Sequence, residues 1–292
     1  MQLLVNALLA GSLLALVAGG LSLVYGVLGV FNLALGQLAL VGGYATWWLT
    51  QQMGLPLLLS IPLGAAIGGL VTWASFELAV APFYRHHRFL PLVTTIALGM
   101  MLDAALLLLF EERPRAILSS EKHMIEFFRM RFSLEQALLV CATILFLLAT
   151  AAVLQRTALG RRIRATAGHP DAARSLGINS SVLHRMLFIG SGVLAALGGI
   201  YMGIDQNLTP TLAFSLTIKA YAALIAGGKD NLFGTILMSY VIALLEQLLV
   251  GLPWAAGQYL PAGYQSVVAL LFIVVVLLIK PSGLFSSHLR IT

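Results

Sequence analysis

Two acidic residues, Asp103 and Glu246, lie within long apolar stretches of the sequence. A carboxyl group in such surroundings is costly, so it either serves an ion or proton path or makes a buried structural hydrogen bond. The residue type favours neither role, and both stay open. Lys219 lies in a third apolar stretch, where its amine either extends to a polar surface or pairs with an acid.

The segment AALIAGGKD at 222–230 looks like a phosphate-binding loop. That motif requires a glycine five residues before the glycine of the GK pair, and a Ser or Thr after the lysine. Ala223 and Asp230 occupy these two positions. The sequence therefore predicts no nucleotide site in this chain, and any ATP would be used by another subunit.

The sequence gives little support for a disulfide, a catalytic group or a metal site. The single cysteine, Cys141, excludes an internal disulfide, and we expect it to be a small core residue. We find no nucleophile, base and orienting group at suitable positions, so no catalytic residues are predicted. No metal site is predicted either, because the histidines lack ligand spacing; those considered are His86, His87, His169, His184 and His288.

The composition is that of a polytopic membrane protein. Hydrophobic residues make up 60% of the 292 residues and charged residues only 10%. Apolar windows predict spans at 3–26, 33–50, 55–80, 90–110, 134–154, 183–204, 212–227, 231–252 and 264–280. Windows 33–50 and 212–227 are short and contain polar residues, so each is either a crossing or a half-helix. We expect an all-α protein with eight or nine transmembrane or half-spanning helices.

Charge predicts which loops face the cytoplasm. The basic segments are RHHR at 85–88, six arginines between 156 and 185, and the tail from 280 to 290, and these should lie inside. The loop at about 111–133 mixes acids and bases, and the segments near Asp205 and at 253–261 carry no base, so these should lie outside. The amino terminus lies outside if 33–50 spans and inside if that window only dips into the membrane.

The basic segment LGRRIRATAGHPDAARSLGIN interrupts this apolar chain at 159–179. Pro170 suits a first helical position, Asp171 a first turn and Gly177 the position just past a helix end, so a two-turn helix is predicted. Asn179 should cap the next helix. The arginines could contact lipid headgroups, or the helix could dock a cytoplasmic partner; a DNA-binding role is disfavoured because membrane spans flank the segment.

This segment resembles the cytoplasmic loop of the branched-chain amino acid permease family of ABC importers, with its pattern GR..RA.A.D...A...GI. The resemblance implies that the two-turn helix is a coupling helix, within a loop at about 155–184, that fits a groove on the ATP-hydrolysing subunit. The residues expected to couple are Arg161, Arg164, Pro170, Asp171, Ala173, Arg174, Leu176, Gly177, Ile178 and Asn179.

Other segments extend the resemblance over nearly the whole chain. YGVLGVFNLALGQLALVGGY at 25–44 is similar to the family's YG..G..NFAHGE....GAY segment, although Leu35 and Gln37 replace its common His and Glu. FELAVAPFYRHHR is similar to the ER...RPLR element, with Ala81 where Arg is usual. The later blocks from 219 and from 280 also match. These departures bear on the substrate more than on the fold.

A zwitterionic amino acid needs donors for its carboxylate and acceptors for its ammonium group. The ends of broken helices supply both without charged side chains. The interrupted, glycine-rich windows at 26–43 and 203–228 are therefore the predicted substrate path. The path residues expected there are Asn32, Gly36, Gln37, Gln206, Asn207, Lys219 and Tyr221.

We interpret residues 1–292 as one transmembrane permease domain of the bacterial inner membrane, importing branched-chain or other hydrophobic amino acids. The resemblance implies these partners: cytoplasmic ATPase subunits that bind ATP and Mg, a second permease subunit forming a heterodimer or homodimer, and an extracytoplasmic binding protein. Membrane lipids are also partners, and nucleic acid is not. The alternatives are an importer of the same family for urea, short amides or a sugar, and a proton-coupled secondary transporter using Asp103 or Glu246.

Overall fold

A computed structural model of the chain describes residues 2–84, 89–118, 124–127, 130–229, 231–251, 265–280 and 283–285. The long helices are α1 (Gln2–Leu28), α2 (Leu35–Gln51), α3 (Leu57–Ser75), α5 (Leu90–Phe110), α6 (Leu134–Arg156), α9 (Ser180–Asp205), α10 (Leu212–Gly227), α11 (Leu232–Gly251) and α12 (Gln265–Ile279). The shorter elements are the π-helical segment η1 (Phe76–Val80), α4 (Ala81–Tyr84), α7 (Ala158–Gly168), α8 (Pro170–Ser175), and strands β1 (Met124–Phe127) and β2 (Met130–Ser133).

Each predicted apolar window coincides with one long helix to within a few residues at each end, and the windows 90–110 and 212–227 have the same bounds as α5 and α10. Among the described residues, six helices are long and apolar enough to cross a membrane, and α10 and part of α12 are shorter apolar helices. Helices α1 and α9 are mostly buried, whereas α5 and α6 expose most of their apolar side chains. An exposed apolar helix face is expected where lipid replaces water.

Three local features differ from the expectations. The 111–133 loop contains an antiparallel hairpin of β1 and β2, so the fold is helical but not entirely α. Window 55–80 ends in η1, where the Ala81 amide donates to the Phe76 carbonyl. The Thr94 hydroxyl of α5 donates to the carbonyl of Ala79 in this segment. Cys141 is exposed on α6, so its assignment to the core was wrong.

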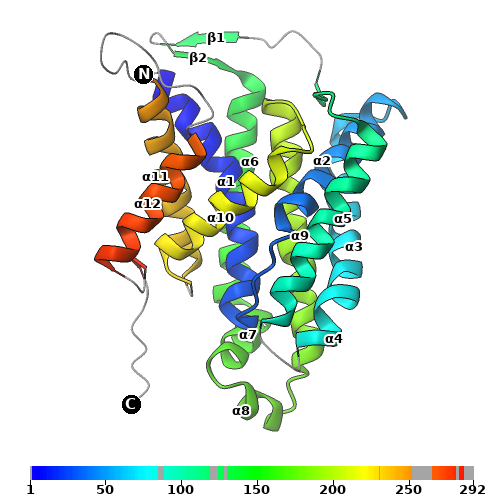
Figure 1. The fold of residues 1–292 in the computed structure, drawn as a ribbon, viewed down its shortest axis with the longest axis vertical. Coiled ribbons are helices and arrows are strands. Elements are labelled where there is room, and N and C mark those ends of the chain that lie inside the picture. The colour runs from blue at the N-terminus through cyan, green and yellow to red at the C-terminus, as the bar shows by residue number, and fades with distance from the viewer. Residues whose placement is uncertain are drawn as a thin grey trace.

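The bundle has two ends, marked by the β-hairpin and by α8 (Figure 1). The amino terminus lies at the hairpin end, α1 runs to the opposite end, and α2 finishes back at the hairpin end. This arrangement is the one expected if window 33–50 completes a crossing. The loop 85–88, the segment 253–261 and the tail after 285 lie outside the described residues, so their sides stay predictions.

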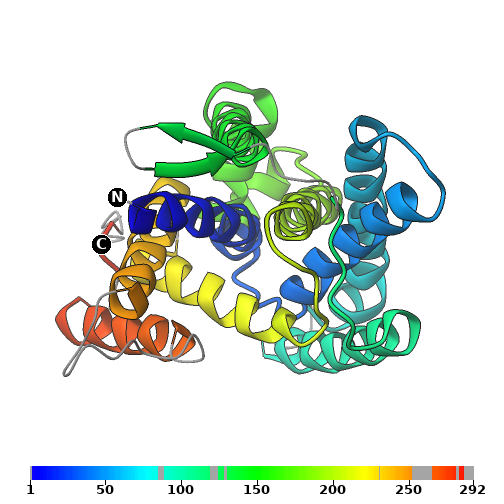
Figure 2. The same ribbon diagram turned by 90° about the horizontal axis from the view of Figure 1, so that it is seen from above.

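Helices α1 and α9 lie at the centre of the bundle when it is viewed from the hairpin end (Figure 2). Helices α2, α3 and α9 pack against one another with their backbones close together. A side chain at Gly199 would overlap the Ala39 carbonyl, and one at Gly42 would overlap Ala196. Gly192 of α9 approaches Thr72 of α3 in the same way. We call these three contacts the glycine seam. Small residues of this kind allow close helix approach in membranes.

Candidate functional site

The helical path breaks between α1 and α2, at residues 29–34. Gly29 adopts a φ of 63°, which ends α1, and its amide donates to the Tyr25 carbonyl at 2.9 Å. The Asn32 side-chain oxygen accepts from the Ala34 amide at 3.2 Å. From α5, the Thr95 hydroxyl accepts from the Leu33 amide and donates to the Phe31 carbonyl, each at 3.3 Å. Side chains therefore satisfy the exposed backbone of this break, as a broken helix within a membrane requires.

The first turn of α2 lies against α10. The Gly36 amide donates to the Thr217 hydroxyl at 3.0 Å, and that hydroxyl donates to the Ala213 carbonyl at 3.0 Å. A side chain at Gly36 would overlap the Ala213 carbonyl and Thr217, so only glycine allows this approach. The amino end of α2, with its partial positive charge, is thus buried beside α10.

Gln37 and Asp103 meet next to the break. The Gln37 amide group donates to the Asp103 carboxylate at 3.0 Å. Within the described part of the chain, three buried polar atoms here have no hydrogen-bond partner: Asn32 Nδ2, Gln37 Oε1 and Asp103 Oδ1. One is a donor and two are acceptors. Unpaired buried polar atoms are rare in native proteins, and such a group of them indicates a place where a ligand or water can bind.

Aromatic rings border the same break. The rings of Tyr25 and Phe31 have centroids 4.7 Å apart, and those of Phe31 and Tyr221 are 5.7 Å apart. Tyr221 comes from α10, one helical turn after Thr217. Apolar surface therefore adjoins the polar atoms of Asn32 and Gln37.

The second acid and the predicted lysine form an ion pair. Lys219 Nζ of α10 lies 3.0 Å from Glu246 Oε2 of α11, and their side chains are 17% and 7% exposed. Burial on both sides makes this a structural tie between two helices, and Lys219 is not extended to a surface. The second oxygen of Glu246 has no partner among the described residues.

Two predicted path residues lie elsewhere. Gln206 and Asn207 are exposed in the turn after α9, at the hairpin end. The following residue, Leu208, forms a short antiparallel bridge with Arg115, with hydrogen bonds of 3.0 and 2.8 Å. The structure thus brings together Asn32, Gly36, Gln37 and Tyr221, and it separates this group from Gln206 and Asn207.

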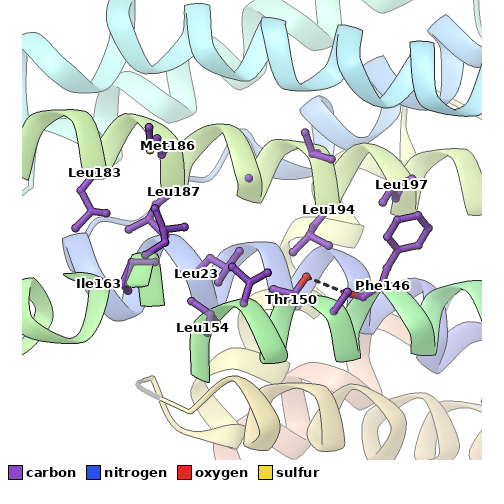
Figure 3. Close-up of a pocket in the computed structure, with 15 residues that line it drawn as sticks. Leu23, Phe146, Thr150, Leu154, Ile163, Leu183, Met186, Leu187, Leu194 and Leu197 are labelled. Carbon is purple, nitrogen blue, oxygen red and sulfur yellow. Dashed lines mark hydrogen bonds between the residues drawn. The ribbon is translucent and has the colours of Figure 1, made fainter. Parts of the chain in front are cut away.

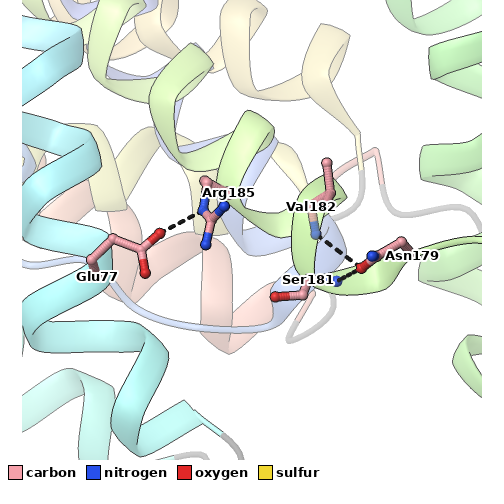
Figure 4. A network of polar contacts seen from close by, with 5 residues as sticks. All are labelled: Glu77, Asn179, Ser181, Val182 and Arg185. Atoms are coloured by element: carbon pink, nitrogen blue, oxygen red, sulfur yellow. Dashed lines mark hydrogen bonds and ion pairs between the residues drawn. The ribbon is translucent and has the colours of Figure 1, made fainter.

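The predicted two-turn helix is confirmed as α8, which begins at Pro170. The Gly177 amide donates to the Arg174 carbonyl at 2.9 Å, and the Ile178 amide to the Ala173 carbonyl at 3.1 Å. With a φ of 81° at Gly177, these bonds make a Schellman motif. The Asn179 side chain then caps α9 as predicted, accepting from the amides of Ser181 and Val182 (Figure 4).

The side chains of α8 and of the turn after it divide into buried and exposed ones. Ala173 is buried and Ile178 packs on a core cluster, whereas Leu176 is 81% exposed. Asp171 and Arg174 are also exposed, with side chains 3.7 Å apart. This end of the bundle therefore offers an exposed apolar side chain with charges beside it.

Helix α7, which sequence reasoning did not separate from its loop, carries the basic residues. It buries Gly160, Ile163 and Thr166 and exposes Arg161, Arg162 and Arg164. The Thr157 side chain caps its start by accepting from the Gly160 amide at 3.2 Å.

An ion pair connects the start of α9 to η1. Arg185 Nε lies 2.5 Å from Glu77 Oε1, close to the Asn179 cap (Figure 4). The pair is partly exposed, so its contribution to stability is small. The position of the pair is more informative, because it links α9, the helix that follows α8, to η1 at the end of α3.

The AGGK segment has a structural role in the described chain. Gly228 adopts a φ of 105°, and the carbonyls of Ala226 and Gly227 accept from the amides of Leu284 and Phe285 at 2.8 and 3.2 Å. The segment thus holds the chain that follows α12. Asp230 lies outside the described residues.

Sequence reasoning missed Thr95 and Thr217, which hold the break. Hydroxyl side chains in apolar helices commonly bond to their own helix, as Thr46 and Thr72 do here, so no sequence signal distinguished these two. Among the described residues, no three His, Cys, Asp or Glu side chains are grouped as a metal site would need.

Comparison with known proteins agrees with this architecture. The chain is 29% identical to the high-affinity branched-chain amino acid transport system permease protein BraD of Pseudomonas aeruginosa, covering 97% of this chain and 95% of BraD. It is 25% identical to LivH of Escherichia coli K12, a permease of the same description, over 97% and 94% of the two chains.

Among solved structures, a chain of a transporter assigned to the metal-chelate type of ABC transporter, in an inward-facing conformation, has a similar fold. Its TM-score is 0.51 at 14% identity, over 95% of this chain and 85% of that one. The family described as branched-chain amino acid transport system / permease component matches residues 3–277. The chain is a multi-pass membrane protein, and it belongs to this permease family.

Proposed function

We propose that this chain is the membrane-spanning subunit of an ABC importer for branched-chain or other hydrophobic amino acids, in the inner membrane of a bacterium. The observation that carries the proposal is α8, a short helix with a buried Ala173, followed directly by the exposed Leu176. So short a helix is unstable alone in water, and packing against other surfaces stabilises it. The bundle supplies the inner surface, and a cytoplasmic ATPase subunit supplies the outer one.

Coupling follows from the connections of α8. Its carboxyl end joins α9 through the Schellman turn and the Asn179 cap, with four residues between the helices. A force on α8 therefore acts on α9 directly, and through Arg185 on Glu77 and η1. A π-turn is a weak point in a helix and a frequent hinge. We infer that ATP and Mg bind only on the partner subunits and that their closure tilts α9 and α3.

The break before α2 is the proposed substrate site. Asn32 Nδ2 would donate to the carboxylate of an amino acid, and Gln37 Oε1 and Asp103 Oδ1 would accept from its ammonium group. The rings of Tyr25, Phe31 and Tyr221 would contact an apolar side chain. This combination favours a hydrophobic amino acid over urea, a short amide or a sugar, which lack one or more of these groups.

The remaining parts of the assembly follow from the family. A binding protein would deliver substrate at the hairpin end, where Gln206, Asn207 and strands β1 and β2 are located. Transport would require a second permease subunit, either a related chain or a copy of this one. We assign the α8 end to the cytoplasm, which gives nine crossings with the amino terminus outside.

The test is the variant Leu176→Glu, purified with its ATPase subunits in detergent. It should release the ATPase, because a carboxylate would replace the apolar side chain at the centre of the contact. Ala158→Glu is the control, since it adds the same charge to the exposed first turn of α7, where an acid is favourable. Retention of the ATPase by Leu176→Glu, or equal release by both variants, would refute the coupling role.

The proton-coupled alternative is tested in proteoliposomes with the binding protein and a panel of amino acids, urea and sugars. Uptake that needs ATP and continues without a proton gradient supports the importer. Uptake that persists without ATP and stops when the gradient is removed would instead make Asp103 or Glu246 a proton carrier.

A further inference from the structure

A cavity of about 360 Å³ lies between α6 and α9. Phe146, Thr150 and Leu154 line it from α6, Met186 and Gly190 from α9, and Leu23 of α1 forms its floor (Figure 3). We call it the α6–α9 groove. Its volume falls in the range of roughly 300 to 1,000 Å³ that small-molecule sites occupy.

The groove exists because α6 packs on α1 and α7 and only lightly on α9. Gly190 keeps it open, since a side chain there would meet no atom within 4 Å. Its one hydroxyl on α6, that of Thr150, already donates to the Phe146 carbonyl at 2.8 Å. The side chains that line the groove therefore need no polar group from a ligand, and an apolar hydrocarbon chain would fit there.

The α8 end of the groove is basic. Leu159 and Ile163 of α7 close this end, and the same helix exposes Arg161, Arg162 and Arg164. Arg164 donates to the carbonyl of Leu154, a residue that lines the groove, which places its guanidinium at the mouth.

Few acids of this chain offset these arginines. Between 134 and 185 the acids are Glu135, in the first turn of α6 at the hairpin end, and Asp171, which pairs with Arg174. Glu77 of η1 pairs with Arg185. Among the described residues no acid forms an ion pair with the exposed arginines of α7, so they are available to an anion from outside the chain.

We propose that the α6–α9 groove is a binding site for an anionic phospholipid of the leaflet on the α8 side. One acyl chain lies along Leu23, Gly190 and Thr150, and the phosphate lies among the arginines of α7. Because lipid tails are as apolar as the lining, the acyl chain adds fit, and the headgroup charge provides the selectivity. The site contains no residue of α8, although Arg161 and Arg164 of α7 are also among the residues expected to couple.

The experiment uses the full-length permease, with its ATPase subunits, in lipid nanodiscs. The probes are phosphatidylglycerol and phosphatidylcholine that each carry a photoreactive diazirine at the end of one acyl chain, and labelled peptides are identified by mass spectrometry. Phosphatidylglycerol should label α6 and α9 within 146–197 more than phosphatidylcholine does. Each arginine near an anionic headgroup should contribute roughly a fivefold preference.

Two comparisons of variants distinguish the contribution of the lipid headgroup from that of the acyl chain. Arg161→Gln with Arg164→Gln should reduce the preference for phosphatidylglycerol, whereas Arg113→Gln, beyond the end of α5, should not. Gly190→Leu should block labelling by both probes, whereas Gly168→Leu, which also places its side chain in open space, should leave labelling unchanged. Equal labelling by the two lipids, unchanged labelling in Gly190→Leu, or a groove covered by a protein subunit would overturn the proposal.

Discussion

The ion pair between Lys219 and Glu246 gives the sharpest prediction for this bundle. Glu246→Gln keeps the shape of the side chain and leaves the buried Lys219 ammonium without a counter-charge. Removing one partner of a buried pair costs about 3 to 5 kcal/mol. Since Lys219 is 17% exposed and Glu246 only 7%, water or headgroups can relieve some of this cost, and we expect a loss of about 3 kcal/mol in the free energy of unfolding.

The double variant Lys219→Met with Glu246→Met should recover most of this loss, because replacing both charges by apolar groups is often neutral or stabilising. The assay is unfolding of the purified chain in mild detergent, followed by tryptophan fluorescence. A loss below about 1 kcal/mol in Glu246→Gln, or a double variant no more stable than either single one, would refute the reasoning. If the pair is only structural, the double variant also keeps ATP-driven uptake.

Two further predictions concern the ends of α2 and α8. Thr217→Val leaves the buried Gly36 amide without its acceptor and should cost about 1 to 3 kcal/mol in the same unfolding assay, whereas Thr217→Ser should cost less; equal stability of the two variants would contradict a role for the hydroxyl. Gly177→Ala places a side chain at a φ of 81° and should weaken the Schellman turn by roughly 1 to 2 kcal/mol, seen as faster amide hydrogen exchange at Ile178. Gly177→Asn should exchange more slowly than Gly177→Ala, and the reverse order would exclude this explanation.

Local signals in the sequence predicted the structure best where one short segment determines it. The start of α8 at Pro170, its end at Gly177 and the Asn179 cap depend on backbone preferences within a few residues, and the structure has all three. The long apolar windows were also reliable, because a membrane-length helix needs nearly every residue in it to be apolar.

Contacts between side chains on different helices could not be predicted from the sequence. Asp103 and Lys219 stood out as polar residues, but their partners Gln37 and Glu246 are 66 and 27 residues away, and the choice among acids depends on how the helices pack. Gln206 and Asn207 are polar residues of the kind expected where a membrane helix is interrupted, but they lie in an exposed turn at the hairpin end. The α7 helix and the β-hairpin were missed, although the Thr157 cap of α7 and the pairing of β1 with β2 both involve residues close in sequence.

The glycine seam has a consequence for how far motion can spread. Where Gly199 meets the Ala39 carbonyl and Gly42 meets Ala196, no flexible side chain separates the backbones, so nothing can absorb a displacement by changing rotamer. Helices α2, α3 and α9 should therefore shift as one body, carrying the entire break at 29–34 with them. A single added methyl group in this contact would force the helices apart, and it would alter the timing of every step that depends on their joint movement.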